Sequence, residues 1–295
     1  MSTERAAYIS PFSRRYASKE MQHLFSEDYK FRTWRRLWIA LAESEKELGI
    51  NISDQQINEL KQFADDINYE VAEQKEREIR HDVMSHVYAY GCQATEGSKI
   101  LHLGATSCFV GDNTDLIIIK ESLILVKKRL LKVIKNLSEF STEYKDTPVL
   151  GFTHYQPAQL TTMGKRASLW LYDFLSDFKE IEYRLDGLLA RGVKGTTGTQ
   201  ASFMNLFDND EEKIAQLDEL VSKKIGFEQA FPVTGQTYPR KTDAFILSSL
   251  SGLAQSAHKF GTDIRLLANL KEIEEPFEKK QVADMIYRRL NRIRF

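Results

Sequence analysis

The stretch LIIIKESLILVKKRLLKVIKNLSEF, residues 116–140, decides the fold. Its apolar residues recur at alternating spacings of three and four, which is the period of one helix face rather than of a strand. The predicted helix, of about 30 residues, would be roughly 45 Å long. A second apolar row in the same stretch predicts burial on more than one side. The first row is Leu116, Ile119, Leu123, Val126, Leu130, Val133, Leu137 and Phe140, and the second is Ile117, Ile124, Leu131 and Ile134.

Two further segments repeat this pattern, one from Met163 to Leu188 and one from Ile246 to Leu267. Three long apolar rows of near-heptad spacing are typical of an antiparallel helical bundle with coiled-coil-like packing. Strand signals are few, so the sequence predicts an all-α fold. Either the N-terminal helices or other subunits must cover the wide apolar rows, and their width favours an oligomer.

Shorter helices are predicted in the N-terminal part of the chain. Residues 31–48 have a helical apolar pattern that stops at Gly49. Ser53 or Asp54 is suited to cap the following helix. Residues 68–91 have a helical pattern with an expected interruption.

Composition limits the classes of function. The chain has 295 residues, of which 42% are apolar and 28% charged, and its formal net charge is -1. This balance gives no electrostatic reason to expect binding to nucleic acid or to an anionic membrane. The only cysteines, Cys92 and Cys108, are too few for a disulfide framework, and the apolar runs are too short for a membrane span. We therefore expect a cytoplasmic protein.

Polar residues gather where the helical pattern breaks, and loops on a rigid scaffold often carry function. Thr106 and Ser107 precede the first long helix together with GDNTD, residues 111–115, which either caps that helix or helps to hold an anion. His154 lies in GFTHYQPAQL before the second long helix. It is either a structural residue or a group that transfers protons near neutral pH.

Two more junctions lie between the second and third long helices: one follows the second helix and the other precedes the third. RGVKGTTGTQASF, residues 191–203, lacks the Gly-Lys-Ser/Thr ending of a phosphate-binding P-loop, so it is either a polar loop near an anion or a plain turn. Gln236 lies in FPVTGQTYPRK and is a candidate amide contact for a ligand. Pro239 suits the first turn of the helix that follows.

The segment IRHDVMSHV contains Arg80, His81 and Asp82. His81 and His86 are five residues apart, whereas two zinc ligands on one helix need a spacing of four. The sequence therefore predicts no metal site. Asp82 and His86 are four apart, which allows a structural pair on a helix.

Taken together, these segments resemble the adenylosuccinate lyase family of the fumarase/aspartase superfamily, in its animal-type form. The resemblance runs in order from about residue 10 to Gln281. It rests on SRRYASKEM, FRTWRRLWIALAESEKELG, RHDVMSHV, HLGATSCFVGDNTDL, GFTHYQPAQLTTMGKR, RGVKGTTGTQASF, TGQTYPRK and DIRLLANLKEIEEPFEKKQ.

The resemblance implies an all-α, fumarase/aspartase-like fold, with an N-terminal helical domain over residues 1–111 and a long-helix bundle domain over residues 112–281. It implies a homotetramer in which three subunits form each active site. The implied reaction is β-elimination of fumarate from adenylosuccinate, which gives AMP, and from the succinylated carboxamide intermediate of de novo purine synthesis. The purine nucleotide is a small-molecule substrate, and the family needs no metal or organic cofactor.

The resemblance also assigns roles to residues. His154 falls on the family's catalytic histidine, taken as the general acid that protonates the leaving nitrogen. A dianionic succinyl group and a phosphate call for arginines, hydroxyls and helix N-termini, which agrees with the residue types at the other positions. The implied substrate contacts are Arg15, Tyr16, Arg80, His81, Asp82, Thr106, Ser107 and Gln236.

After Gln281 the chain departs from the family, which continues with GSSAMPYKRNP and its serine base. Here VADMIYRRLNRIRF, residues 282–295, follows as a tail that does not match, so the C-terminal part of the fold is expected to be missing. Two hypotheses follow: a lyase subunit, or a truncated, non-catalytic form that assembles with or regulates full-length subunits. We expect little activity from the chain alone, because a general base contributes about 10²–10⁴-fold.

Overall fold

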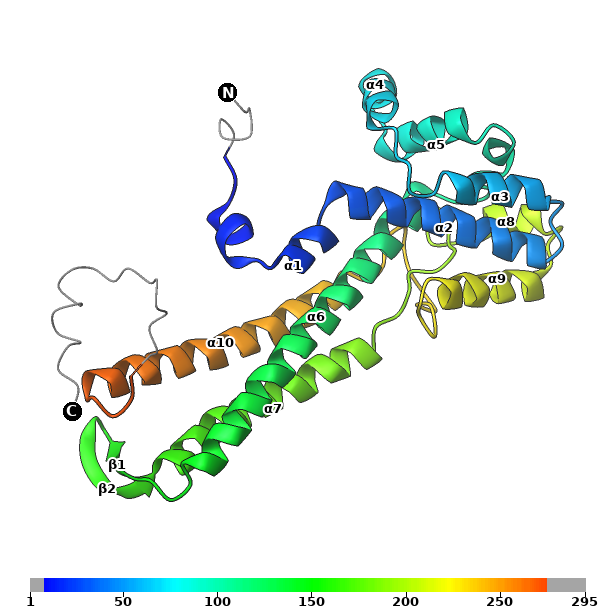
Figure 1. The fold of residues 1–295 in the computed structure, drawn as a ribbon. Coiled ribbons are helices and arrows are strands. Elements are labelled where there is room, and N and C mark those ends of the chain that lie inside the picture. Colours follow the sequence, from blue (N-terminus) through cyan, green and yellow to red (C-terminus); the bar gives the residue numbers. More distant parts are fainter. Residues whose placement is uncertain (1–7, 275–295) are drawn as a thin grey trace, which may run out of the picture. The chain divides into compact units, whose positions relative to one another are not determined.

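The computed structural model describes residues 8–274 (Figure 1), so the predicted tail over residues 282–295 lies outside the described residues. The chain forms two compact units. The described part of unit 1 is residues 8–132 together with Phe178–Ser249, and that of unit 2 is Val133–Asp177 together with residues 250–274. The unit boundaries fall inside three long helices. They do not test the expected domain boundary between residues 111 and 112, which stays a prediction.

The described elements are almost all helical, as the sequence predicts. The long helices α6, α7 and α10 each contribute to both units, the antiparallel hairpin of β1 and β2 lies in unit 2, and the other elements lie in unit 1. In chain order the elements are the π-helix η2 (Phe12–Tyr16), α1 (Lys19–Leu24), α2 (Glu27–Glu47), α3 (Asp54–Gln62), α4 (Tyr69–Ile79), α5 (Asp82–Gln93), the 3₁₀-helix η3 (Gly97–Ile100), α6 (Ser107–Glu143), β1 (Pro148–Thr153), β2 (Gln156–Thr162), α7 (Met163–Asp186), α8 (Ala201–Leu206), α9 (Glu211–Lys224) and α10 (Lys241–Asn269).

The predicted helix ends of the N-terminal part are confirmed. Helix α2 ends at Glu47, and Gly49 takes the positive φ of 100° that commonly follows a helix. Ser53 caps α3 through a capping box with Gln56, in which each side chain accepts a hydrogen bond from the other residue's backbone N–H. The expected interruption within residues 68–91 is Arg80, whose φ of 55° separates α4 from α5.

Two predicted helix starts differ from the structure. Helix α6 begins at Ser107, so GDNTD lies inside the helix and does not cap it. Asp112 and Asn113 are instead buried and bonded to distant loops, a tertiary use that their capping propensity does not reveal. Pro239 lies two residues before α10 rather than in its first turn.

Within a single chain, some residues of the apolar row on α6 are buried and others are exposed. Every seventh residue, Leu116, Leu123, Leu130 and Leu137, is buried. The alternate position Val133 is exposed, and the second row also leaves large side chains in solvent, with Leu131 54% exposed. One chain therefore covers only part of the apolar surface that the sequence places on this helix.

The core of unit 1 forms around α2. Trp34, Leu37, Trp38 and Leu41 are almost fully buried on this helix, which contacts α3 and α9. A tryptophan or leucine side chain that leaves water contributes on the order of 2 kcal/mol or more. None of the helices in residues 8–274 combines the length and apolar content that a membrane crossing needs.

The side chain of Glu45 on α2 is buried in this unit without a partner. Its exposure is 0%, and neither carboxylate oxygen has a hydrogen-bond partner in the structure. Burial raises the pKa of Glu45 to about 9, because the charged form loses its hydration. At neutral pH the folded chain therefore keeps a proton on this carboxyl that the unfolded chain releases.

This difference predicts how stability depends on pH. Because the pKa of Glu45 is higher in the folded state, the free energy of unfolding falls by about 1.4 kcal/mol per pH unit as pH rises from the ordinary Glu value toward the folded value. We expect Glu45→Gln to remove this part of the slope, as measured by urea unfolding from about pH 5.5 to about pH 8.5. Glu73→Gln, at an exposed site on α4, is the matched control. An unchanged slope in Glu45→Gln would contradict the assignment.

Candidate functional site

The N-terminal ends of α5 and α6 bring predicted site residues together in unit 1. His81 is the N-cap of α5, and its Nδ1 accepts a hydrogen bond from the backbone N–H of Met84 over 3.2 Å. Its Nε2 lies 3.2 Å from Oγ of Ser107, the first residue of α6. Residues from two predicted segments therefore meet through direct side-chain contact.

These contacts fix the tautomer of His81. Since Nδ1 accepts a hydrogen bond from the backbone N–H of Met84, the proton of the neutral ring is on Nε2, which donates to Oγ of Ser107. The hydroxyl hydrogen of Ser107 is then left to donate to a ligand. It lies at a helix N-terminus, where unpaired backbone N–H groups and the helix dipole favour an anion. The arrangement suits a carboxylate.

Thr106, Arg80 and Asp82 flank this contact. Thr106 is buried, and its carbonyl accepts from the N–H of Phe109. Arg80 has left-handed backbone, which places it in the turn directly before His81. Asp82 begins α5, and its Oδ1 lies 3.8 Å from Nδ1 of His81. All five residues that the sequence predicts in these two segments therefore lie at the two helix starts.

The structural pair that the spacing allowed between Asp82 and His86 is not formed in the described chain. His86 stacks on Phe31 with ring centroids 3.8 Å apart and lies edge-on to Trp34. Burial lowers the pKa of His86 to about 4, so the ring is a neutral core residue. In residues 8–274, no group of three or more His, Cys, Asp or Glu side chains is placed to hold a metal ion.

The glycine-rich segment over residues 191–203 joins the same region. Oγ of Ser202 donates to the carbonyl of Gly104 over 2.6 Å, which links this segment to the one that carries Thr106 and Ser107. Arg191 is fully buried, and its Nε donates to the carbonyl of Gln236 over 2.9 Å. Gln236 itself is exposed. The polar junctions before α6, after α7 and before α10 are thus hydrogen-bonded to one another.

Two glycines in this segment are required by close packing. Gly192 has a φ of 73°, and a side chain there would clash with Oδ1 of Asp218. Gly198 has a φ of 80°, and a side chain there would clash with the carbonyl of Thr234. Sequence reasoning noticed these glycines but missed the role of Arg191 and took Asn113 for a capping residue, because both roles depend on contacts with residues far away along the chain.

Arg15 and Tyr16 lie in η2 and are exposed. Among the described residues, their side-chain contacts are local: the Arg15 guanidinium lies 5.7 Å from the ring centroid of Tyr16, and Tyr16 lies against Phe12. No hydrogen bond or ion pair of the described chain connects either residue to the His81–Ser107 contact.

His154 lies in unit 2, at the tip of the hairpin. Thr153 pairs with Gln156, so His154 and Tyr155 form a two-residue turn with φ values of 56° and 60°. Positive φ at both central residues is typical of a type I′ hairpin turn. The stretch between α6 and α7 is therefore a hairpin, and its tip holds the imidazole in an exposed position.

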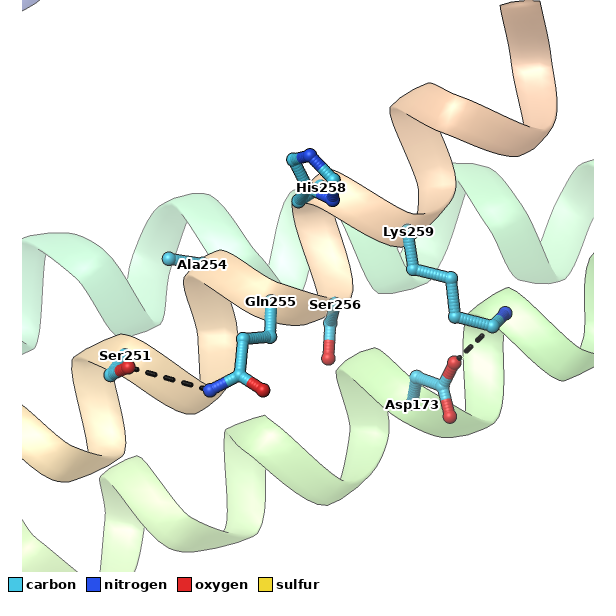
Figure 2. A pocket seen from close by; sticks show the side chains of 7 residues that line it. All are labelled: Asp173, Ser251, Ala254, Gln255, Ser256, His258 and Lys259. Carbon is cyan, nitrogen blue, oxygen red and sulfur yellow. Dashed lines mark hydrogen bonds and ion pairs between the residues drawn. The ribbon is translucent and has the colours of Figure 1, made fainter.

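The described residues of unit 2 line two of the surface hollows of this chain. One of about 810 Å³ is lined by the hairpin, α7 and α10, including Thr153 and Tyr155 on either side of His154. The other, of about 620 Å³, is shown in Figure 2, where Lys259 of α10 reaches Asp173 of α7 over 3.4 Å. None of the predicted site residues lines this second hollow.

Comparison with known proteins gives a family and several relatives. The family model described as "Lyase" matches residues 15–282. The chain is 51% identical over 288 residues to an adenylosuccinate lyase of Schizosaccharomyces pombe, covering 96% of this chain and 60% of that protein. It is 50% identical over 287 residues to the Saccharomyces cerevisiae protein of the same name, with the same two coverages. The chain thus spans about 60% of the length of these relatives.

Solved structures with the same fold are more distant. A fumarate lyase from Mesorhizobium sp. BNC1 superposes with a TM-score of 0.76 at 24% identity, over 86% of this chain and 58% of that one. A 3-carboxy-cis,cis-muconate lactonizing enzyme from Pseudomonas putida gives 0.74 at 21% identity, over 87% and 57%. These likenesses confirm the predicted fumarase/aspartase-like fold.

The two contacts of His81 predict different outcomes for two substitutions. His81→Ala removes the N-cap of α5 and is expected to lower the free energy of unfolding by about 1 kcal/mol. His81→Asn keeps a capping oxygen but is too short to reach Ser107, so we expect a loss of only a few tenths of a kcal/mol. Chemical denaturation of the two variants and the unmodified chain measures the difference. Equal losses in both variants would contradict the capping role.

Proposed function

Because this chain belongs to the lyase family, we propose that it is a subunit of an adenylosuccinate lyase. The reaction is β-elimination of fumarate from adenylosuccinate, which gives AMP, and from the succinylated carboxamide intermediate of de novo purine synthesis. Two lines support the proposal: relatives with this name are 50–51% identical, and the His81–Ser107 contact at two helix starts has the chemistry of a carboxylate site. That contact is the structural observation that carries the proposal.

The substrate's succinyl carboxylate would bind at the start of α6. Ser107 would donate its hydroxyl hydrogen to this carboxylate, since Nε2 of His81 already donates a hydrogen bond to the serine oxygen. Thr106 and the first backbone N–H groups of α6 add polar contacts. Donors that hold a carboxylate beside the carbon that loses a proton stabilise the negative charge that spreads onto the carboxylate oxygens during elimination.

Arginine and amide side chains would hold the rest of the nucleotide. Arg80 and Arg15 offer guanidinium groups that bind a phosphate or carboxylate with two parallel hydrogen bonds. Gln236 presents an exposed amide, and Tyr16 and Asp82 complete the proposed contacts. Binding energy from these distant groups orients the reacting bond.

His154 is the proposed general acid. An imidazole exchanges protons near neutral pH, which suits protonation of a departing nitrogen. The ring is exposed at the tip of a short hairpin, which leaves it accessible to the substrate bound by a neighbouring subunit in the proposed oligomer. His154 belongs to unit 2 and the proposed carboxylate site to unit 1, and we propose that different subunits supply them to one active site.

Exposed apolar side chains support the oligomer that this proposal needs. Long helices leave Leu131, Leu169, Leu247 and Leu266 in solvent when one chain is considered alone. Apolar rows of this length are typical of surfaces that another subunit covers. We propose a homotetramer or a mixed oligomer with full-length subunits, located in the cytoplasm and working without a metal or organic cofactor.

One arrangement is a mixed oligomer with full-length subunits, of whose length this chain covers about 60%. In such an oligomer a full-length subunit supplies the family's serine base, and this chain supplies His154. The alternative is that the chain assembles with full-length subunits without contributing to catalysis, and thereby regulates them. Both alternatives predict assembly, but only the first predicts turnover that depends on His154.

Complementation separates these alternatives. The chain is mixed with a full-length S. pombe relative in which the histidine equivalent to His154 is replaced by glutamine. We expect neither protein alone to release fumarate and the mixture to release it, because only the mixture combines a base with an acid.

The same mixture made with His154→Gln of this chain is the matched control and should be inactive. Gel filtration of each mixture, with activity measured on the fractions, reports assembly separately from turnover. Mixed oligomers that form but release no fumarate would contradict the catalytic role. Fumarate release by the purified chain alone would show that it needs no full-length partner.

A further inference from the structure

Arg191 is a fully buried cation that bonds to backbone rather than to acids in the described structure. Nε donates to the carbonyl of Gln236 over 2.9 Å, Nη1 to that of Lys194 over 2.7 Å, and Nη2 to that of Gly195 over 3.1 Å. A buried charge is costly unless hydrogen bonds satisfy it. This guanidinium therefore depends on keeping two separate segments, residues 191–195 and the one around Gln236, in fixed positions.

Helix α6 fixes the first of these segments next to Arg191. Asn113, fully buried, accepts from the N–H of Gly192 and donates to its carbonyl, both over 3.2 Å, and also donates to the carbonyl of Phe109. These paired bonds hold the backbone directly after Arg191 against a rigid helix. The backbone from which the Arg191 side chain extends is thus held in place.

Hydrogen bonds of the described residues tie the second segment to α6 just after Gln236. Tyr238 donates its N–H to Oδ2 of Asp112 over 2.7 Å, and Arg240 lies 3.3 Å from Oδ1 of the same carboxylate. On the other side, the N–H of Phe231 bonds to the carbonyl of Ala190. Between these points, the hydrogen bond from Arg191 holds Gln236 itself.

We infer that Arg191 is a positioning residue, which holds Gln236 in the orientation that presents its side chain to a purine nucleotide. The ligand part of this inference rests on the proposed function, whereas the positioning of the segment does not. Arginine is required because its planar fork reaches carbonyls of two segments at once, and a lysine ammonium is a single point. Lys194, which pairs with Asp218 over 2.7 Å, holds the glycine-rich segment but does not reach Gln236 by any described contact.

Hydrogen exchange of the ligand-free chain tests the positioning. In Arg191→Lys we expect the amides of Phe231 and Tyr238 to exchange about tenfold faster, which corresponds to losing about one hydrogen bond. Amides of α2 and α9 should be unchanged. Arg129→Lys, the same substitution at an exposed site on α6, is the matched control. Unchanged exchange at Phe231 and Tyr238 in a folded Arg191→Lys would overturn the inference.

Asn113→Ala provides a second test, which can be used even if Arg191→Lys does not fold. Asn113→Ala releases Gly192 from α6 but leaves the guanidinium intact. Because Arg191 then extends from a loosened segment, we expect the same two amides to exchange faster. Exchange unchanged at both amides in this variant would also overturn the inference.

A double-mutant cycle tests whether Arg191 acts through Gln236. The probe is AMP, whose binding to the chain in its mixed oligomer with full-length subunits is measured by calorimetry. We expect Arg191→Lys to raise the Kd about tenfold when Gln236 is present and to have no effect in a Gln236→Ala background. Equal effects in both backgrounds would overturn action through Gln236. If AMP does not bind at all while exchange is faster in Arg191→Lys, the proposed function fails and the positioning stands.

Discussion

The structure depends on the way that the first two turns of α6 hold residues far away along the chain. Ser107 in the first turn contacts His81, and Asn113 in the second turn binds Gly192, which is 79 residues away. Asp112 receives the N–H of Tyr238 from 126 residues away. Because a helix is rigid over two turns, these contacts fix the relative positions of segments that lie far apart in the sequence. The candidate carboxylate site lies at the first of these contacts, between His81 and Ser107.

Sequence periodicity was enough to predict most of the helices, because the spacing of apolar side chains reflects the face that each helix buries. It also predicted the stop at Gly49 and the cap at Ser53, since both effects are local. The start of α6 was mispredicted because Asp112 and Asn113 have good capping propensity, and tertiary partners decide their actual use. Arg191 was missed for the same reason: nothing near it in the sequence indicates a bond to Gln236.

The candidate site was predictable in its residue types but not in its geometry. Resemblance to a family pointed to His81 and Ser107, but only the structure gives the tautomer that turns the serine hydroxyl into a donor. Periodicity had likewise indicated two apolar rows on α6. The structure separates a buried heptad row from exposed residues such as Leu131, because burial within one chain is a property of the folded molecule.

At the hairpin tip, the backbone conformation favours glycine, whereas the proposed role as a general acid requires a histidine. His154 and Tyr155 both occupy the left-handed region, where a side chain costs roughly 1 kcal/mol or more relative to glycine. A laboratory selection for thermal resistance alone would drift toward Asn-Gly at these two positions, since that pair is favoured in such turns. An imidazole at this position therefore carries a conformational cost that glycine would not.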